Sequence, residues 1–315
     1  MPKSYLERIL RANVYDVARE TPLESMHLLS ERLGHNVLLK REDLQPVFSF
    51  KIRGAYNKIV QLDADQRARG VVCASAGNHA QGVALAAQKL GLRAVVVMPT
   101  TTPQIKSNAV SRLGGEVILH GVSVDESFQR AHAIADDEGM VFVHPFDDVD
   151  VIAGQGTIGH EILRQHGNGI DAIYVPVGGG GLIGGTAAWL REEACVVAVE
   201  PECCPTLSSA LAAGKPVDVE VGGLATDALG ASRIGDIGFA SASRWVDESV
   251  LVPDASIRRA QWLLWNRLRL IAEPGGATAL AGLVSGAFRP RSGGRVAVLV
   301  CGGNTDPAVV AGLSG

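Results

Sequence analysis

The sequence predicts an α/β protein of two lobes, each with an open parallel sheet, that share a cleft. From about Val71 onward, short aliphatic runs alternate with segments whose apolar residues recur at helical spacing, which is the pattern of strand–helix–strand units. The chain has 315 residues, of which 47% are hydrophobic and 20% are charged. This composition excludes a disordered chain and supplies enough apolar material for more than one packed core.

The first series of elements begins at Val71. A helix separates its first two strands, with Asn78 placed to cap it and Gly91 to end it. A second helix, Asp125–Glu138, has apolar residues on one face and ends at Gly139. The expected strands of this series are Val71–Ala74, Ala94–Met98, Glu116–Leu119 and Val141–Val143.

A second series contains a glycine-rich turn, from which a helix runs to about Arg191, and a later helix through Ser256–Leu268. The segment before Val71 is expected to hold a basic helix, one strand at Val37–Lys40 and then an irregular polar stretch. The expected strands of the second series are Ala172–Val177, Cys195–Glu200, Val250–Val252 and Val296–Cys301.

Charge and cysteine content exclude several classes of protein. The net charge of −4 argues against a nucleic-acid-binding surface. The N-terminus carries charges where a signal peptide needs an apolar run, and no aliphatic stretch is long enough to span a bilayer. The five cysteines form no C-x-x-C pair, and the adjacent Cys203 and Cys204 suit neither a disulfide nor a zinc site. We therefore expect a cytoplasmic protein without a metal site.

The glycine-rich turn indicates an anion-binding site. Gly178, Gly179, Gly180 and Gly181 lie between a strand and a helix, so that unobstructed backbone N–H groups and the positive end of the helix favour a phosphate. The pattern leaves open which phosphate-bearing cofactor binds, a dinucleotide or a cofactor of another class. The turn also matches G-x-G-x-x-G with Glu200 at the end of the next strand, as in a dinucleotide-binding NAD enzyme. A tight turn without a ligand is the third interpretation.

Lys51 is a candidate nucleophile. It lies in Phe48-Ser49-Phe50-Lys51-Ile52-Arg53, between aromatic residues and the start of a helix, in a chain that is poor in lysine. Removal from water would lower the pKa of the amine and make it reactive toward an aldehyde. A lysine that lies over apolar surface with its ammonium group in solvent is the alternative.

Two further segments carry polar groups at the ends of expected strands. Ser75-Ala76-Gly77-Asn78-His79 follows a strand and begins a helix, so its N–H groups could hold a carboxylate, and the Asn78 amide could donate to a phenolate oxygen. A plain helix cap is the alternative role of Asn78, and His79 is expected to be a structural hydrogen-bonding residue. Cys301 ends the last strand, a natural place for a ligand, where we expect it to form hydrogen bonds.

Together these segments resemble the threonine/serine dehydratase family, whose members use pyridoxal 5′-phosphate and share the tryptophan-synthase-β fold, known as fold type II. The similarity runs from about Tyr5 to Asp306. It implies a discontinuous large cofactor-binding domain of residues 1–50 and 150–315, and a small mobile substrate domain of residues 51–149. The motifs that carry it are Ser49–Ala55, Ser75–His79, Gly178–Gly181, Glu273-Pro274-Gly275-Gly276-Ala277 and Cys301-Gly302-Gly303-Asn304.

The resemblance also implies a role for each candidate residue. Lys51 would form the Schiff base with the cofactor and later take the Cα proton of the substrate, while Phe50 would lie against the pyridine ring. Asn78 would contact the phenolate oxygen, and Cys301 would face the pyridine nitrogen. The groups expected to hold the phosphate are Gly178, Gly179, Gly180 and Gly181. The groups expected to hold the substrate carboxylate are Ser75, Ala76, Gly77, Asn78 and His79.

The implied activity is β-elimination of a hydroxy amino acid, L-threonine giving 2-oxobutanoate and ammonia and L-serine giving pyruvate, by a homo-oligomeric enzyme. A dehydratase for 3-hydroxyaspartate or phenylserine, a serine racemase, a β-replacement enzyme, an NAD-dependent oxidoreductase and a non-catalytic amino-acid sensor are the alternatives. The chemistry that separates the two cofactor classes is covalent attachment to an amine, which pyridoxal phosphate forms and a dinucleotide does not.

Four features depart from the pattern of the family. Ala76 stands where racemases carry a serine, so we expect little racemisation. Glu200 matches one acid of a cation site, but Thr206 replaces the second, so no metal is expected. Ala228 replaces a usual glycine near the cofactor, which leaves the substrate open. The sequence ends at Gly315, which predicts no regulatory domain and no feedback inhibition.

Overall fold

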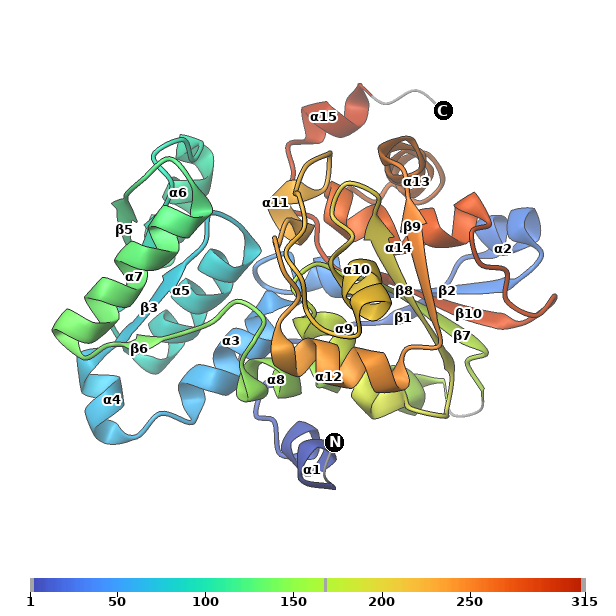
Figure 1. The fold of residues 1–315 in the computed structure, drawn as a ribbon. Helices are drawn as coiled ribbons and strands as arrows, with labels where there is room; N and C mark the ends of the chain where they lie inside the picture. The colour runs from blue at the N-terminus through green and yellow to red at the C-terminus, as the bar shows by residue number, and fades with distance from the viewer. Residues whose placement is uncertain (1–2, 167–168, 313–315) are drawn as a thin grey trace.

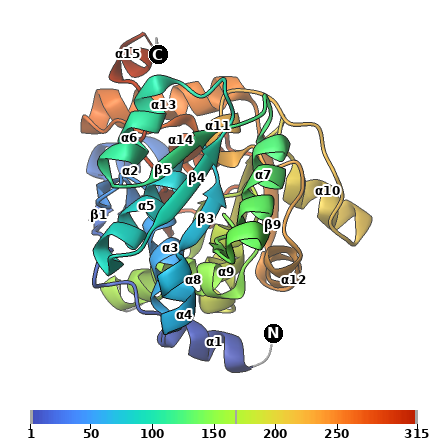
Figure 2. The same cartoon turned by 90° about the vertical axis from the view of Figure 1, so that its left-hand side faces the viewer.

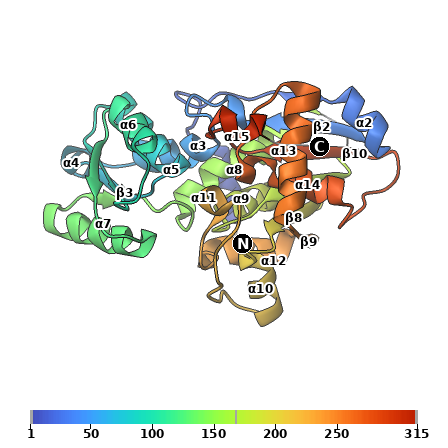
Figure 3. The same ribbon diagram turned by 90° about the horizontal axis from the view of Figure 1, so that it is seen from above.

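The computed structural model describes residues 3–166 and 169–312 and contains two separate sheets. A six-stranded sheet and a four-stranded sheet form the centres of two units that lie side by side (Figures 1 and 3). This arrangement confirms the predicted two-lobed α/β class. The outer ends of the predicted large domain include residues outside the described ranges.

The six-stranded sheet has the order β1-β2-β10-β7-β8-β9. Strand β1 runs antiparallel to β2, and all other neighbours are parallel. Buried aliphatic residues fill the central strands because both faces of the sheet are covered by helices. The strands are β1 (Leu23–Ser25), β2 (Asn36–Arg41), β7 (Ala172–Pro176), β8 (Cys195–Pro201), β9 (Glu248–Val252) and β10 (Arg295–Val300).

Helices cover the two faces of this sheet as the side-chain alternation of its strands requires. Val298 and its same-face neighbours pack on one group of helices, and Leu299 packs on the other. The first group is α2 (His27–Leu33), α13 (Asp254–Leu268) and α14 (Pro274–Ser285). The second group is α8 (Val149–Gln165), α9 (Gly181–Leu190), α10 (Thr206–Ala213) and α12 (Asp236–Trp245).

The four-stranded sheet is parallel throughout, in the order β5-β4-β3-β6. Helices α5 (Asn78–Leu90) and α6 (Gln104–Arg112) cover one face of this sheet, and α7 (Val124–Glu138) covers the other (Figure 2). Cys73 packs with the first two helices, whereas Val72 packs with α7. Its strands are β3 (Val71–Ala74), β4 (Ala94–Met98), β5 (Glu116–Leu119) and β6 (Val141–Phe142).

The remaining elements are mostly short. Helix α3 lies between the two sheets and crosses α8 at very short range (Figure 1). A Cβ atom on Gly54 would lie 2.6 Å from the Val151 carbonyl oxygen, and one on Gly154 would lie 2.7 Å from the Arg53 carbonyl oxygen. The elements are α1 (Lys3–Leu10), η1 (Glu42–Leu44), α3 (Lys51–Val60), α4 (Ala64–Arg69), α11 (Thr226–Leu229) and α15 (Pro307–Ala311).

The sequence located the predicted strands to within a residue or two at each end. It missed β1, α2 and α4 in the N-terminal part, which are short and only weakly periodic. The expectation that Asn78 caps its helix was wrong. Gly77 occupies the cap position without a side-chain cap, and Asn78 is the first helical residue, which leaves its amide free for other contacts.

The crossing of α3 and α8 yields the first prediction. Gly154→Ala should lower the free energy of unfolding by about 2 kcal/mol, because the added methyl group meets backbone atoms that cannot rotate away. Chemical denaturation measures the change. Gly222→Ala is the matched control, since a Cβ atom there has no neighbour within 4 Å. Equal stability of the two variants would contradict the close contact.

Candidate active site

The candidate residues meet where strands of both sheets end. In a parallel sheet the loops at the carboxyl ends form the binding edge, and Cys301, the glycine-rich turn and Ser75–His79 follow β10, β7 and β3, respectively. The chain that leads to Lys51 is fastened to this edge. Phe50 N donates to the Cys301 carbonyl at 3.1 Å, and Gly303 N donates to the Phe48 carbonyl at 2.9 Å.

The Lys51 amine lies between the two units. Its Nζ donates to the Pro145 carbonyl at 2.7 Å and lies 5.4 Å from the centre of the Phe50 ring. Burial lowers the pKa of Lys51 to about 8, although Cys301 and Glu273 act in the opposite direction. A useful fraction of this amine is therefore uncharged near neutral pH, which is the form that attacks an aldehyde.

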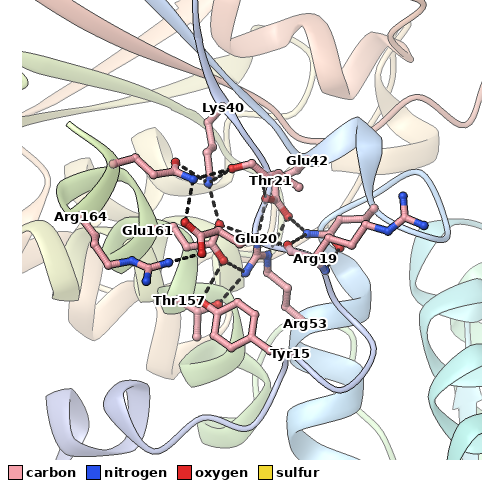
Figure 4. Close-up of polar contacts among 12 residues, drawn as sticks. Tyr15, Arg19, Glu20, Thr21, Lys40, Glu42, Arg53, Thr157, Glu161 and Arg164 are labelled. Atoms are coloured by element: carbon pink, nitrogen blue, oxygen red, sulfur yellow. Dashed lines mark hydrogen bonds and ion pairs between the residues drawn. The ribbon is translucent and has the colours of Figure 1, made fainter.

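A buried ion network holds the start of α3, two residues from Lys51 (Figure 4). Arg53 Nε donates to Glu42 at 2.7 Å, its Nη1 donates to Glu161 at 2.5 Å and to Thr157 at 3.0 Å. Lys40 Nζ donates to the other oxygen of Glu161 at 2.6 Å. The side chains of Arg53, Glu42, Glu161 and Lys40 are fully buried.

The network balances its charges without solvent. Two cations face two carboxylates, and the guanidinium of Arg53 fills its fork with carboxylate, hydroxyl and carbonyl acceptors. Burial alone would raise the pKa of Glu42, but Arg53 and Lys40 hold it below its usual value. Because loss of one partner would leave an uncompensated buried charge, the network fixes α3 against β2, η1 and α8.

The glycine-rich turn presents unused donors. Gly180 has a φ of +90°, which glycine adopts without strain. A Cβ atom on Gly179 would collide with the Phe146 ring, and one on Gly178 would lie 2.8 Å from Leu229 Cα. Within the described residues, the backbone N–H groups of Gly178–Gly181 donate no hydrogen bond. The turn thus requires glycine and offers an anion four free donors at the start of α9.

Asn78 takes part in a buried hydrogen-bond chain that joins the two units. Its Nδ2 donates to Glu273 Oε1 at 2.6 Å, and its Oδ1 accepts from Asn304 Nδ2 at 2.7 Å. Burial raises the pKa of Glu273 to about 7. The motif that contains Glu273 was part of the family resemblance, but no role was predicted for this carboxyl, and its partner Asn78 lies 195 residues away in the sequence.

Cys301 is buried beside the same carboxyl group. Its Sγ lies 3.5 Å from the Gly275 carbonyl, and burial raises the pKa of the thiol well above its usual range. The thiol is therefore neutral and not a nucleophile. The adjoining glycines allow close contacts. A Cβ atom on Gly276 would lie 2.0 Å from the Gly302 carbonyl oxygen, so the two backbones touch there. A Cβ atom on Gly302 would lie 2.0 Å from the Glu273 side-chain oxygen Oε1.

Not every N–H group of the Ser75–His79 loop is available to a ligand. Ser75 N donates to Val97, and Gly77 N donates to the Ser75 hydroxyl at 3.2 Å. In the described part of the chain, the N–H groups of Ala76, Asn78 and His79 donate to no protein acceptor. His79 is buried, with Nε2 2.9 Å from the Val143 carbonyl, which fits the expected structural role.

Glu200 was a candidate for binding a ribose hydroxyl or a cation. The structure directs its carboxylate inward, where Leu207 N, Ser208 N and the Ser208 hydroxyl donate to it at 2.7, 2.8 and 2.6 Å. These donors occupy both oxygens. Over residues 3–166 and 169–312 no cluster of three or more histidine, cysteine or acidic side chains could hold a metal ion. No helix in those ranges has the length and apolar character that a bilayer crossing needs.

Comparison with known proteins assigns the family. The family described as pyridoxal-phosphate dependent enzyme matches residues 14–302, and the chain belongs to this family. Its cofactor is therefore pyridoxal 5′-phosphate, and the dinucleotide interpretation of the glycine-rich turn is wrong.

Individual relatives identify the group within the family. The chain is 51% identical to a biosynthetic L-threonine dehydratase of Pasteurella multocida over 282 residues, which cover 89% of this chain and 55% of that protein. It thus spans about half the length of the curated relatives it matches. Among solved structures, the processed threonine deaminase isoform 2 of Solanum lycopersicum has a TM-score of 0.93 and 41% identity, covering 99% of this chain and 87% of that one.

A racemase is also structurally close. Maize serine racemase has a TM-score of 0.91 and 32% identity, with 97% of this chain and 95% of that chain covered. These similarities confirm the predicted threonine/serine dehydratase family and fold type II.

The raised pKa of Glu273 predicts how stability depends on pH. The folded chain holds this proton up to about pH 7, whereas the unfolded chain releases it near 4.5. The stabilisation is therefore complete below pH 4.5 and is lost as pH rises to about 7, a change of at most roughly 3 kcal/mol. Glu273→Gln, which keeps an acceptor for Asn78, should remove this loss.

Urea unfolding of the cofactor-free chain at pH 5 and pH 7 measures the effect. The exposed Glu31→Gln is the control and should retain the wild-type pH dependence. An unchanged pH dependence in Glu273→Gln would show that another group binds the proton.

Proposed function

We propose that this protein catalyses the dehydration and deamination of L-threonine to 2-oxobutanoate and ammonia, and of L-serine to pyruvate. The observation that carries the proposal is a partly buried Lys51 amine with a lowered pKa at the same strand ends as a turn of free N–H donors. The named activity of relatives at about half sequence identity supports L-threonine as the substrate.

The residues present fit pyridoxal 5′-phosphate. Lys51 would attach it, Gly178–Gly181 would hold its phosphate, and Phe50 would lie against its ring. Asn78 would contact the phenolate oxygen and Cys301 the ring nitrogen. When bound, the cofactor supplies an electron sink for negative charge at the substrate Cα atom.

In this proposal the protein moves the protons and selects the bond that breaks. The Lys51 amine takes the proton from Cα, a role suited to its pKa of about 8. The neutral Cys301 thiol cannot stabilise positive charge on a pyridine nitrogen as a carboxylate would, which favours prompt loss of the β-hydroxyl group over transamination. The free N–H groups of Ala76, Asn78 and His79 would bind and orient the substrate carboxylate.

We further propose that residues 51–149 act as a small domain whose four-stranded sheet closes over the substrate, while α3 at its start stays held to the large domain by Arg53. The ion pair of Lys106 Nζ with Asp227, 2.7 Å apart, joins α6 to α11 across the two units and is a contact that such a motion would make and break. The Lys106 side chain is 28% exposed and the Asp227 side chain is 80% exposed, so water can solvate both charges and the ion pair breaks at little cost. Closure would exclude water from the reacting groups.

A cytoplasmic location and a homo-oligomeric state complete the proposal. All five cysteines are free thiols, which suits a reducing compartment. The oligomeric state rests on the family resemblance.

The first test of this function removes the amine. Lys51→Ala should reduce release of 2-oxobutanoate from L-threonine at least about a thousandfold, because the variant lacks both attachment and the base. After borohydride reduction, mass spectrometry should find the pyridoxyl group on Lys51 of the wild type. Lys89→Ala, which changes an exposed lysine, should retain activity. Normal turnover by Lys51→Ala would reject the assignment.

Ala76 distinguishes the dehydratase from the racemase. A hydroxyl group at this position would place a second proton donor in the substrate loop. Ala76→Ser should therefore raise serine racemisation relative to elimination by at least about tenfold. Chiral chromatography and pyruvate release measure the ratio, and incorporation of deuterium at Cα reports proton delivery directly. An unchanged ratio would show that Ala76 does not limit racemisation.

A further inference from the structure

Three carbonyl groups of the glycine-rich turn, those of Gly178, Gly179 and Gly180, each accept a hydrogen bond. The Thr206 hydroxyl donates to the Gly178 carbonyl at 2.7 Å. Gly235 N donates to the Gly179 carbonyl at 3.0 Å, and Gly184 N donates to the Gly180 carbonyl at 2.9 Å. Three successive peptide groups of the turn are thus each fixed, two by donors from distant parts of the chain and the third by the first turn of α9.

This bonding determines the direction of the N–H groups. In a trans peptide the C=O of one residue and the N–H of the next point in opposite directions in one rigid plane, and the described chain has no cis peptide bond. Each N–H of Gly179, Gly180 and Gly181 therefore points away from the donor that holds the carbonyl of its own peptide. The donors of the turn are aimed before any anion arrives.

Thr206 provides the side-chain contact in this arrangement, while the other two carbonyl groups are held by backbone N–H groups. It is the first residue of α10 and is fully buried. Its hydroxyl oxygen also lies 3.1 Å from Glu200 Oε1. Glu200 is in turn fixed by Leu207 N and by Ser208, so the threonine is held in place on both sides.

We propose that Thr206 is a positioning residue for cofactor binding, which orients the Gly178–Gly179 peptide so that the Gly179 N–H meets the cofactor phosphate. This role rests on the proposed function of the turn as the phosphate site. It is specific to the phosphate, since the partners of the Thr206 hydroxyl among the described residues are the Gly178 carbonyl and Glu200. Loss of the hydroxyl should weaken the grip on phosphate and leave attachment of the aldehyde unchanged.

The test compares the binding of pyridoxal 5′-phosphate with that of pyridoxal, which lacks the phosphate. Thr206→Val, of equal size but without the donor, should bind pyridoxal 5′-phosphate about tenfold more weakly than the wild type. Its affinity for pyridoxal should stay within about twofold. Thr206→Ser restores the hydroxyl and should restore the affinity. Absorbance titration of the cofactor-free protein gives the dissociation constants.

Ser127→Ala is the matched control, because the buried Ser127 hydroxyl also donates to a backbone carbonyl, that of His120 at 3.0 Å, but lies on α7 in the other unit. It should bind both compounds like the wild type. Thr206→Ala, which also lacks the hydroxyl, replaces Thr206→Val if that variant does not fold. Equal losses for both compounds, or no loss for either, would overturn the role of Thr206. Failure of the wild type to bind pyridoxal 5′-phosphate would instead overturn the proposed function.

Discussion

The buried ion network around Arg53 is the constraint on which the candidate site depends. Taking four charged groups out of water is costly, and the structure offsets that cost by pairing Arg53 with both carboxylates and Lys40 with Glu161. A hydrophobic contact would allow α3 to slide or rotate. The forked guanidinium of Arg53 allows one orientation, because its acceptors come from η1, α8 and the N-terminal segment. The position of Lys51 follows from that orientation.

Close approach of backbones is the second requirement. At the crossing of α3 and α8, and where Gly276 meets Gly302, the chains touch at distances that exclude a methyl group. These contacts bring groups from different elements within hydrogen-bond range of one another. The glycines of the motifs therefore serve two purposes: in the turn after β7 they expose N–H donors, and near Cys301 they let the Glu273 carboxyl reach Asn78.

Local sequence patterns and motifs predicted most strands and several site residues of this protein. They did not predict hydrogen bonds and ion pairs between residues that are far apart in the sequence. The strands were predictable because buried parallel strands are continuous aliphatic runs, and Lys51 and the glycine-rich turn were predictable as motifs. The partner of Asn78 lies 195 residues away, so the sequence predicted a cofactor contact or a helix cap for this amide and not its bond to Glu273. Arg53 gave no signal either, since a charged residue on a helix usually faces solvent.

The hydrogen bond between Asn78 and Glu273 has a consequence for how the two sheets separate. It joins a helix that follows β3 to a helix packed on the larger sheet, in surroundings where neither group is exposed. If the sheets moved apart without water entering, the Asn78 amide and the Glu273 carboxyl group would each lose a hydrogen-bond partner. Incoming water offsets that cost by bonding to both groups. Hydration of the gap and its widening are for that reason a single thermodynamic event.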